Sequence, residues 1–163
     1  MHLDENFFYC PALSVSEAEP LLDIEESHHA INVLRLKVGD TIMVTDGSGS
    51  LYKCLILCII KKQVRITIVE KSDVTTSTEP VFTLATSITK KTSFESMLEL
   101  CGQLPVRQII PIITDYSSKQ IDFIKKGTER LDSKLVTSMK QSKKTWLTKL
   151  SGIEEFEDLV KRT

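Results

Sequence analysis

The sequence predicts a mixed α+β protein in which a small β-barrel is followed by an incomplete α/β domain. Runs of β-branched and aromatic residues, separated by turn signals, fill the first half of the chain. The second half changes to an order of strand, helix, strand and helix, which is typical of a parallel sheet covered by helices. A polar segment at residues 72–79, followed by Pro80, separates the two halves and is expected to be a linker. We therefore expect domains at residues 1–74 and 80–163.

The first half contains several short strands and one helix. The clearest signal is Asp46-Gly47-Ser48-Gly49, which is typical of a β-hairpin turn. Pro11 ends the first aromatic strand, and Gly39-Asp40 marks a turn after the helix. The elements expected in chain order are a strand at 7–9, a helix at 25–34, and strands at 41–45, 51–60 and 64–69.

The second half shows the longer periods of helices. Apolar residues recur at helical spacing from Phe94 to Cys101, and Pro105 is expected to end that helix. We expect strands at 81–88 and 106–113, and helices at 94–104, 128–142 and 154–161. Because ligands of open α/β sheets bind beyond the carboxyl ends of the strands, a sheet with only two strands lacks one wall of such a crevice.

Composition gives the class of protein but little about its partners. The chain has 163 residues, 41% of them hydrophobic and 26% charged, with a net charge of −1. The longest apolar run, residues 55–60, is too short to span a bilayer, and acids stand where a signal peptide would be basic. These features predict a cytoplasmic protein with no membrane partner. Residues 134–149, in contrast, hold five lysines and no acid, which indicates a basic patch.

The four cysteines are scattered through the sequence and form no CxxC pair. Cys54 and Cys58 fall on the same face of one expected strand, because side chains alternate along a strand. The spacing favours buried, reduced thiols over a disulfide or a metal site for Cys10, Cys54, Cys58 and Cys101.

The helix expected at 25–34 carries an unusual polar stripe. His28, Asn32 and Arg35 share one face, and Ala30, Val33 and Leu34 are expected to face inward. The adjacent His28 and His29 point apart, which argues against a shared metal ion. Two interpretations remain: a solvated face, or an anion-binding surface made by His29, Arg35 and Lys37.

Two further segments are rich in lysine. Lys90 and Lys91 follow the first α/β strand, where a phosphate site or a Ser/Thr helix cap with surface lysines fits equally well. Lys140, Gln141, Lys143 and Lys144 end a helix beside Trp146. Lysines there stabilise the helix dipole without any ligand, whereas basic residues beside an aromatic ring also suit single-stranded nucleic acid. No glycine-rich phosphate loop, catalytic triad or pair of acids is found in the sequence.

The order of several segments resembles the RsmE family of 16S ribosomal RNA uridine-N3 methyltransferases, which belong to the SPOUT class. The segments are FFYCP, HHAINVLRLKVGD, DGSGSLYKC, TKKTSFESMLELCGQLPVRQIIPI, ERLDSKLVTSMKQSKK and a final TKL. The resemblance implies a PUA-like, RNA-binding barrel, followed by part of a knotted α/β SPOUT domain. It also implies S-adenosylmethionine (SAM) as cofactor, 16S rRNA or the small ribosomal subunit as partner, and a homodimer.

The resemblance carries over to particular residues. His29, Arg35 and Gly39 match H-x5-R-x3-G, Lys90 and Lys91 match a basic loop, and Gln141, Ser142 and Lys144 match a glutamine-centred motif. With Lys37 and Lys140 from the basic segments, these give the predicted RNA-binding residues: His29, Arg35, Lys37, Lys90, Lys91, Lys140, Gln141, Ser142 and Lys144. No catalytic base, cofactor-binding residue or metal ligand is predicted in this chain.

The sequence also departs from the family pattern. Leu100, Gln103 and Pro105 stand where the family usually has lysine, glutamate and glycine, and Tyr116 takes a position that is often basic. The GPEGG-type and L-R-x-E-T-A-type segments, which hold the methyl donor in this family, do not occur before Thr163. We therefore expect these 163 residues alone to be inactive. The alternative to an enzyme is a non-catalytic RNA-binding remnant or degenerate paralogue, and a phosphoryl-transfer enzyme is disfavoured because its loop lacks glycine.

Overall fold

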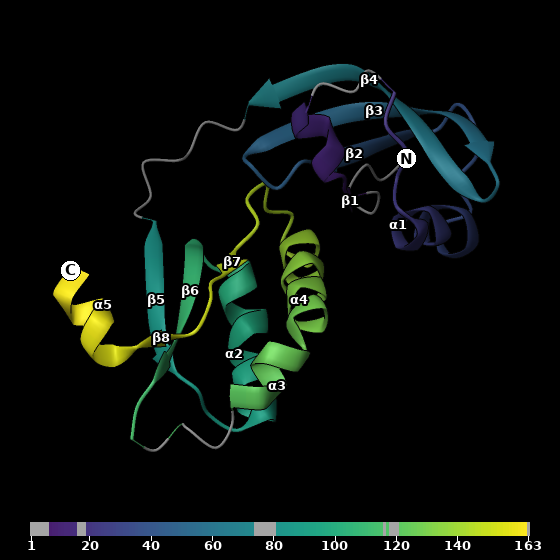
Figure 1. Cartoon of the computed structure of the whole chain (residues 1–163). Coiled ribbons are helices and arrows are strands. Elements are labelled where there is room, and N and C mark those ends of the chain that lie inside the picture. Colours follow the sequence, from purple (N-terminus) through teal and green to yellow (C-terminus); the bar gives the residue numbers. More distant parts are fainter. Residues whose placement is uncertain (1–6, 16–18, 74–80, 116, 118–120, 163) are drawn as a thin grey trace. The chain divides into compact units, whose positions relative to one another are not determined.

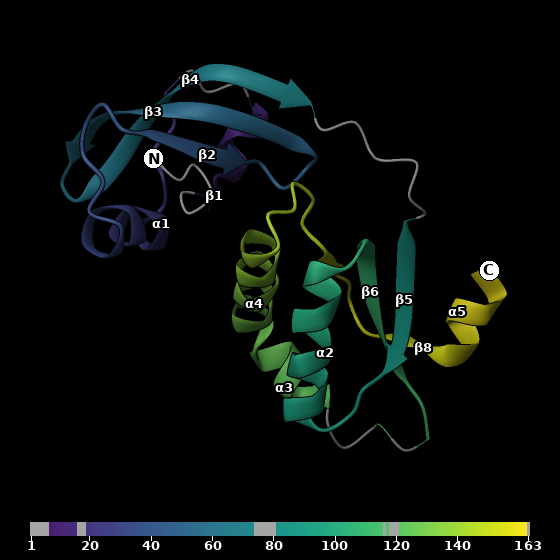
Figure 2. The same cartoon turned by 180° about the vertical axis from the view of Figure 1, so that it is seen from behind.

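The computed structural model describes residues 7–15, 19–73, 81–115, 117 and 121–162. The chain divides into two compact units, which Figures 1 and 2 show from opposite sides. Met1–Ser77 and Lys143–Trp146 form the first, here called the barrel unit, and Thr78–Ser142 and Leu147–Thr163 form the second, the α/β unit. Most of the predicted linker lies outside the described residues, and the strand before it continues to Asp73.

The barrel unit is built on one four-stranded sheet with the order β1-β2-β3-β4. β1 is parallel to β2, and the other neighbours are antiparallel. Its elements are β1 (Phe7–Tyr9), the 3-10 helix η1 (Pro11–Val15), α1 (Ile24–His28), the π-helical turn η2 (His29–Val33), β2 (Thr41–Thr45), β3 (Ser50–Ile60) and β4 (Gln63–Asp73). All the strands expected in the first half of the sequence are therefore confirmed.

The predicted hairpin between β2 and β3 is held by side chains of the turn itself. Asp46 Oδ1 accepts hydrogen bonds from the backbone N–H groups of Ser48 (2.7 Å) and Ser50 (3.3 Å). Gly47 and Gly49 have φ values of 75° and 105°, a region that glycine adopts without steric cost. The Asp-Gly-Ser-Gly sequence thus supplies both the hydrogen-bond acceptor and the backbone freedom that the turn requires.

The turn between β3 and β4 is shorter than the β2–β3 turn, and its sequence is unusual for its backbone conformation. Ile60 pairs with Gln63, so Lys61 and Lys62 alone form the loop, with φ values of 50° and 69°. Two-residue hairpin turns with two positive φ values normally contain Asn-Gly or a similar pair. A non-glycine residue in this conformation costs on the order of 1 kcal/mol or more.

The core of the barrel unit collects inward-facing residues of all four strands. Phe8, Leu22, Ile42, Val44, Tyr52, Cys54, Ile56, Val64 and Ile66 are buried there. Burial and the neighbouring Cys10 raise the pKa of the Cys54 thiol to about 12. Cys54, Cys10 and Cys101 are buried thiols, whereas Cys58 is half-buried beyond an irregularity in the β3–β4 register.

The helix predicted at 25–34 is present, but its second half is a π-helical turn. The N–H of Leu34 donates to the carbonyl of His29 (3.0 Å), five residues back instead of four. The wider turn rotates the following residues relative to a regular helix. Ala30 faces the core as predicted, but Val33, at the end of the wider turn, is 58% exposed, so the prediction that Val33 faces inward is wrong.

The α/β unit has a parallel sheet in the order β5-β6-β7, with β8 also paired to β6. Figure 1 shows α2, α3 and α4 together on one side of this sheet. The elements are β5 (Phe82–Ser87), α2 (Lys91–Gln103), β6 (Val106–Ile113), α3 (Ile121–Lys126), α4 (Thr128–Gln141), β7 (Lys149–Leu150), β8 (Glu154–Glu155) and α5 (Phe156–Arg162). The parallel β5–β6 pair and helices α2 and α4 confirm the α/β prediction.

The sheet is larger than the sequence predicted. The short strands β7 and β8 and the helix α3 were not expected, and the predicted helix at 154–161 begins only at Phe156. The prediction of only two strands is therefore wrong, because β7 and β8 both extend the sheet beside β6. None of the helices in the described ranges is long and apolar enough to cross a membrane.

Helices α2 and α4 run side by side in the same direction. Leu98, Cys101, Leu131 and Leu135 are buried between the helices and the sheet. A Cβ atom on Gly102 of α2 would lie 2.6 Å from the Ser138 Cβ of α4, so this close approach of the two helices requires a glycine. Phe94 packs edge to face on Phe123, with ring centroids 5.7 Å apart.

Candidate functional site

The loop after the π-helical turn presents Arg35 and Lys37 to solvent. Arg35 has a φ of 56°, and both side chains are exposed. The backbone N–H of Lys37 donates to Asp40 Oδ2 (2.7 Å), and the N–H of Gly39 donates to the carbonyl of Ile56 on β3 (2.9 Å). Gly39 has a φ of 93°, and nothing lies within 4 Å of a Cβ atom added there, so the turn conformation is the reason for glycine at this position.

His29 lies apart from these two cations. It is half-buried, and its ring contacts the buried Phe8 edge to face, with centroids 5.9 Å apart. The three residues of H-x5-R-x3-G therefore have different surroundings in the structure: His29 packs against the core, Arg35 is exposed, and Gly39 forms a turn. Arg35 and Lys37 are the members best exposed for contact with an anion.

Lys90 and Lys91 lie where β5 leads into α2. Lys90 is the N-cap residue of α2, and both side chains are exposed. The cap has no side-chain hydrogen bond, so the alternative of a Ser/Thr cap at this position is wrong. Both lysines therefore lie at the N-terminus of α2, after the carboxyl end of β5, where the first N–H groups of a helix have no partner within the helix.

Lys140, Gln141 and Ser142 lie at the opposite end of the helix pair. Because Glu95 pairs with Arg130 and Glu99 with Lys134, α2 and α4 are parallel. The first turn of α2 is therefore separated from the last turn of α4 by roughly the length of α2, about 20 Å at 1.5 Å per residue. The structure does not bring the two predicted basic segments of the α/β unit together.

The residues that follow Gln141 and Ser142 in the chain, Lys143–Trp146, belong to the barrel unit. Ser142 Oγ donates to the carbonyl of Ser138 (2.9 Å), which ends α4. The carbonyl of Thr145 then accepts hydrogen bonds from Thr45 Oγ1 (3.0 Å) and from the N–H of Gly49 (2.9 Å). A Cβ atom on Gly49 would lie 2.3 Å from the Trp146 ring, so Trp146 packs on this glycine.

Trp146 is therefore a packing residue of the barrel unit. It is half-buried and forms a β-bridge with Ser48. This contact with the β2–β3 turn gives the ring a packing role, and stacking of Trp146 on nucleic-acid bases stays a prediction. Lys144, two residues earlier, is half-buried in the same segment.

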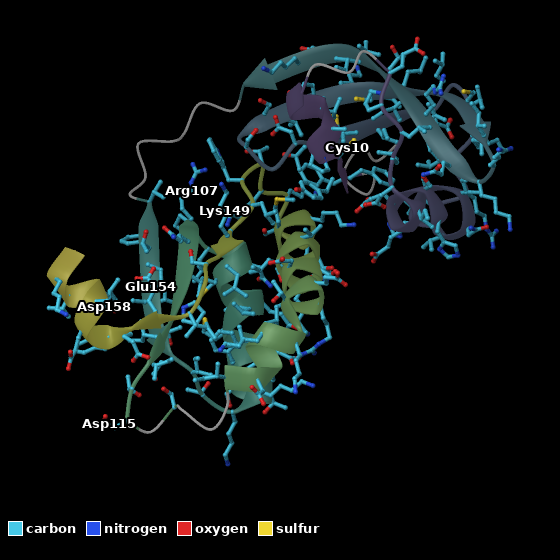
Figure 3. The ribbon with its side chains drawn as sticks, viewed as in Figure 1. Cys10, Arg107, Asp115, Lys149, Glu154 and Asp158 are labelled. Atoms are coloured by element: carbon cyan, nitrogen blue, oxygen red, sulfur yellow. The ribbon has the colours of Figure 1, made fainter. Side chains whose placement is uncertain are left out.

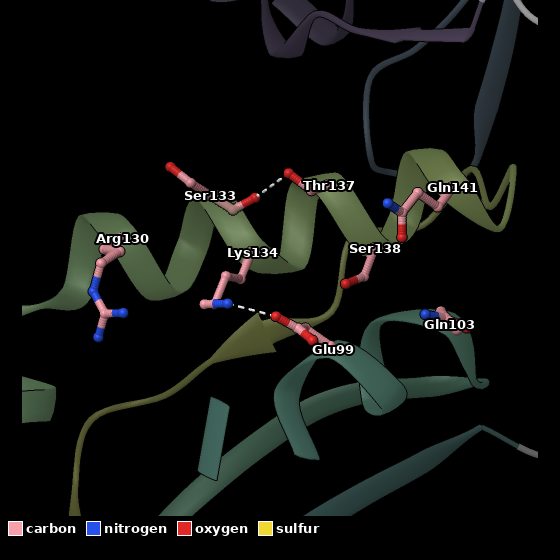
Figure 4. Close-up of a pocket in the computed structure, with 8 residues that line it drawn as sticks. All are labelled: Glu99, Gln103, Arg130, Ser133, Lys134, Thr137, Ser138 and Gln141. Atoms are coloured by element: carbon pink, nitrogen blue, oxygen red, sulfur yellow. Dashed lines mark hydrogen bonds and ion pairs between the residues drawn. The ribbon is translucent and has the colours of Figure 1, made fainter. Parts of the chain in front are cut away.

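A polar cleft of about 440 Å³ lies between α2 and α4, and Figure 4 shows its lining. Lys134 makes ion pairs with Glu95 (3.7 Å) and Glu99, and Arg130 pairs with Glu95. The hydrogen bond from Arg130 is the main reason that the pKa of Glu95 lies below its usual value. The remaining lining is neutral and consists of Gln103, Ser133, Thr137, Ser138 and Gln141.

This charged cleft was not predicted from the sequence. A usable signal was present, because Glu95 and Glu99 are four residues apart on α2, as are Arg130 and Lys134 on α4. Such spacing puts each pair on one helix face. The sequence alone does not show that the two faces meet across 35 residues.

A second cleft, of about 740 Å³, lies at the carboxyl end of β6 and was also missed. It is lined by Ile113, Thr114, Asp115, Glu155, Phe156, Glu157 and Asp158. Figure 3 shows Asp115, Glu154 and Asp158 towards this end, and Arg107 and Lys149 towards the other end of the sheet. The part of the chain that the structure describes contains no group of three or more His, Cys, Asp or Glu side chains able to hold a metal ion.

This acidic cleft does not by itself fit SAM. Its position beyond the strand ends is where α/β sheets bind ligands, and carboxylates suit a cationic ligand. Adenosine recognition, however, requires a largely enclosed pocket with converging polar groups. The side chains of Asp115, Glu155, Phe156, Glu157 and Asp158 are all exposed, so the described residues form one open wall.

Of the four positions that depart from the RsmE pattern, the three described ones, Leu100, Gln103 and Pro105, are exposed. Leu100 is 61% exposed on α2. Gln103 lines the α2–α4 cleft, and the carbonyl of Pro105 accepts a hydrogen bond from the N–H of Phe82 (3.1 Å). Tyr116 lies outside the described residues.

Comparisons with known proteins agree with this architecture. An RNA methyltransferase PUA domain matches residues 21–69, and an RNA methyltransferase domain matches residues 77–163. Ribosomal RNA small subunit methyltransferase E of Synechocystis is 27% identical over 153 residues, which cover 91% of this chain and 48% of the relative. The Bacillus subtilis protein of the same name is 24% identical over 140 residues, 85% of this chain and 55% of the relative.

Solved structures show the same fold. The small subunit methyltransferase E of Neisseria gonorrhoeae, determined with S-adenosyl methionine bound, superposes with a TM-score of 0.79 at 23% identity. The alignment covers 97% of this chain and 66% of the solved one. The chain thus spans about half the length of the curated relatives it matches. With its PUA domain followed by an RNA methyltransferase domain, this chain belongs to the RsmE family of RNA methyltransferases.

Proposed function

We propose that this chain takes part in SAM-dependent methylation of a uridine N3 in 16S ribosomal RNA. The observation that carries the proposal is the match of a PUA domain and an RNA methyltransferase domain, in that order, to residues 21–69 and 77–163. We assign residues 1–74 to RNA binding and residues 80–163 to the first part of the methyltransferase domain. A ribosomal RNA substrate implies a cytoplasmic location and the small ribosomal subunit as partner.

The chemistry requires mainly that two groups are held in line. SAM supplies an activated methyl group, and the RNA must present one base nitrogen to it. Uridine N3 carries a proton, which a general base must remove. The described residues that we assign to this task act on the RNA: Arg35 and Lys37 on the barrel unit, and Lys90 and Lys91 beside α2, would hold phosphates and orient the strand.

The remaining predicted residues have less direct positions for RNA contact. His29 contacts Phe8, and we propose that it supports the loop that carries Arg35. Lys140, Gln141, Ser142 and Lys144 surround the point where α4 ends. We propose that this segment contacts the RNA through Lys140 and Gln141, while Ser142 ends the helix.

Loss of one phosphate contact should weaken binding and lower its salt dependence. We predict that Arg35→Ala lowers the salt slope of binding to 16S rRNA fragments by about one. The measurement is fluorescence anisotropy over a series of salt concentrations, with circular dichroism to show that the fold is intact. An unchanged affinity and slope would assign Arg35 to structure alone.

The donor site is tested separately. Because the acidic cleft is open, we expect residues 1–163 neither to bind SAM at sub-millimolar concentration nor to methylate RNA. Isothermal titration with SAM and a tritiated-methyl transfer assay on small ribosomal subunits measure both. Stoichiometric SAM binding by this chain would contradict our interpretation of the cleft.

We also propose that residues 1–163 form a homodimer more weakly than the longer relatives that they match. The surfaces available are α2 and α4, and Leu100 on α2 and Leu104 directly after it are exposed. Sedimentation equilibrium at micromolar concentration should show a mixture of monomer and dimer. A fully formed dimer at that concentration would show that another surface mediates assembly.

The alternative is a non-catalytic RNA-binding protein. A phosphoryl-transfer enzyme is disfavoured because the loop at residues 89–93 contains no glycine. RNA binding without methyl transfer, also in a fusion of this chain to the C-terminal part of a relative's methyltransferase domain, would select this alternative.

A further inference from the structure

All non-glycine residues described with a left-handed backbone are cations. Arg35, Lys61, Lys62 and Lys143 have φ values of 56°, 50°, 69° and 55°. Asn, Asp and His are the non-glycine residues enriched in this region of backbone conformation. Lys and Arg make up only 21 of the 163 residues, so composition does not account for four cations in four such positions.

Three of these cations lie at the same end of the barrel unit. Thr41 at the start of β2 pairs with Leu55, so the rest of β3 extends past β2 towards the Lys61-Lys62 turn. The loop that carries Arg35 is fixed against this extension, because the N–H of Ile56 donates to the carbonyl of Asp40 (2.9 Å). Figure 1 shows this end of β3 and β4 on the same side of the barrel unit as α1.

The distance between the two turns suits a nucleic-acid strand. Five residues separate Ile56 from Lys61, which corresponds to about 17 Å along a β-strand. A nucleic-acid strand, which carries one phosphate per nucleotide, would therefore place more than one phosphate along this span. Cations at both ends of such a segment would fix its direction on the protein.

The side chains at this end are available for contact. Arg35, Lys61 and Lys62 are exposed, and no ion pair involves them within the described ranges. Two acids of this region, Asp40 and Asp23, accept hydrogen bonds from the backbone instead. Asp40 accepts from the N–H of Lys37 (2.7 Å), and Asp23 caps α1 by accepting from the N–H of Glu26 (2.7 Å).

We propose that Arg35, Lys61 and Lys62 form one phosphate-binding edge of the barrel unit, on which the RNA backbone is held. The inference rests on the proposed RNA-directed function and adds the Lys61-Lys62 turn, which the sequence did not single out as a site. The left-handed turns hold the cations in short loops, where their side chains are exposed. Lys143 is not included, because it belongs to the segment 143–146, which contacts the β2–β3 turn at the other end of β3.

The experiment separates the charge from the turn conformation. In the full chain, Lys61→Asn with Lys62→Gly removes both charges but gives the sequence that a two-residue turn of this type prefers. We expect the thermal midpoint of the barrel unit to rise. We also expect affinity for a fluorescein-labelled 16S rRNA fragment to fall roughly 25-fold at 0.1 M salt, because each lost contact with a single strand removes a factor of about 5 there.

The salt slope gives a second readout. It should fall by about 1.4 for the two lost contacts on a single strand. The matched variant Lys61→Arg with Lys62→Arg keeps both charges and should bind like the wild type. If the Asn-Gly variant fails to fold, Lys61→Gln with Lys62→Gln repeats the measurement in the original turn.

The outcomes distinguish this inference from the proposed function. If the wild type binds the RNA and the charge-removed variant binds it with the same affinity and salt slope, the phosphate-binding edge is wrong. The proposed function is not affected by that result. No binding of the RNA by the wild type overturns both. Loss of affinity in the charge-removed variant, together with retained affinity in the arginine variant, supports the edge.

Discussion

The barrel unit and the α/β unit are stabilised by different features of the sequence. Every described residue with a positive φ, glycine or not, lies in the barrel unit, where tight turns connect antiparallel strands. The α/β unit instead relies on the packing of α2 on α4 and on the ion pairs of Glu95 and Glu99 with Arg130 and Lys134. Backbone conformation limits substitution in the first unit, and side-chain packing and charge limit it in the second.

Each unit also has its own spectroscopic signal. Trp146 is the single tryptophan of the chain and packs on Gly49 in the barrel unit, so its fluorescence follows that unit. The long helices α2 and α4 lie in the α/β unit and dominate the helical signal in far-ultraviolet circular dichroism. We expect a substitution in one unit to shift the unfolding transition seen by that unit's signal and to leave the other transition unchanged.

The largest effect is expected from Phe94→Ala in the α/β unit. Phe94 is buried and packs on Phe123, so its removal should cost about 3–5 kcal/mol of unfolding free energy through lost burial and a cavity. Urea unfolding followed by circular dichroism should shift to lower urea, while the fluorescence transition of Trp146 stays in place. Coincident shifts of both signals would show that the two units unfold as one.

The next largest effect is expected from Gly49→Ala in the barrel unit. The new Cβ atom would overlap the Trp146 ring, and alanine is strained at a φ of 105°. Together these should cost about 2–4 kcal/mol. The fluorescence of Trp146 should change in emission maximum, and its unfolding midpoint should fall.

Gly39→Ala is the matched control for that substitution. Gly39 has a similar φ of 93°, but nothing lies within 4 Å of an added Cβ atom. It should therefore lose only the backbone contribution, about 1 kcal/mol. Equal losses for both variants would show that contact with Trp146 adds nothing to the requirement for glycine at position 49.

The elements that the sequence predicted are those with a strong local pattern. Alternation in β2 and β3, the Asp46–Gly49 turn and the helical spacing of Phe94, Leu98 and Cys101 all depend on neighbouring residues. The two-residue strands β7 and β8 are too short to show any period, and they exist only because β6 offers a free partner. The π-helical turn that exposes Val33 also leaves no signal in the apolar spacing.

In the candidate site, too, the sequence predicted local features but not contacts between distant residues. Its loops and lysines were visible in the sequence, but the contact of Trp146 with Gly49 and the pairing of Glu95 with Arg130 join residues far apart in the chain. Nothing local distinguishes a tryptophan that packs on a distant glycine from one that stacks on a base. The left-handed conformation of Lys61 and Lys62 follows from β3–β4 register, which the sequence defines only loosely.

The smallest effect concerns pH and should be confined to the α/β unit. The hydrogen bond from Arg130 keeps the pKa of Glu95 below its ordinary value of 4.5. The unfolded state therefore binds more protons than the folded state between the two pKa values, and the stabilisation is present above 4.5. It is lost as the pH falls through the folded-state pKa. Glu95→Gln should accordingly lower the stability of the α/β unit at neutral pH, and the difference from the wild type should disappear in acid.

The measurement is a series of urea transitions, followed by circular dichroism, from neutral pH to below the pKa of Glu95. Comparison with the wild type cancels the opposite effect of Asp132, whose pKa burial raises in both proteins. The control is Glu70→Gln, an exposed glutamate on β4, which should leave the α/β transition unchanged at every pH. A gap between wild type and Glu95→Gln that stays constant into acid would mean that the side-chain packing of Glu95, and not its charge, stabilises the contact between α2 and α4.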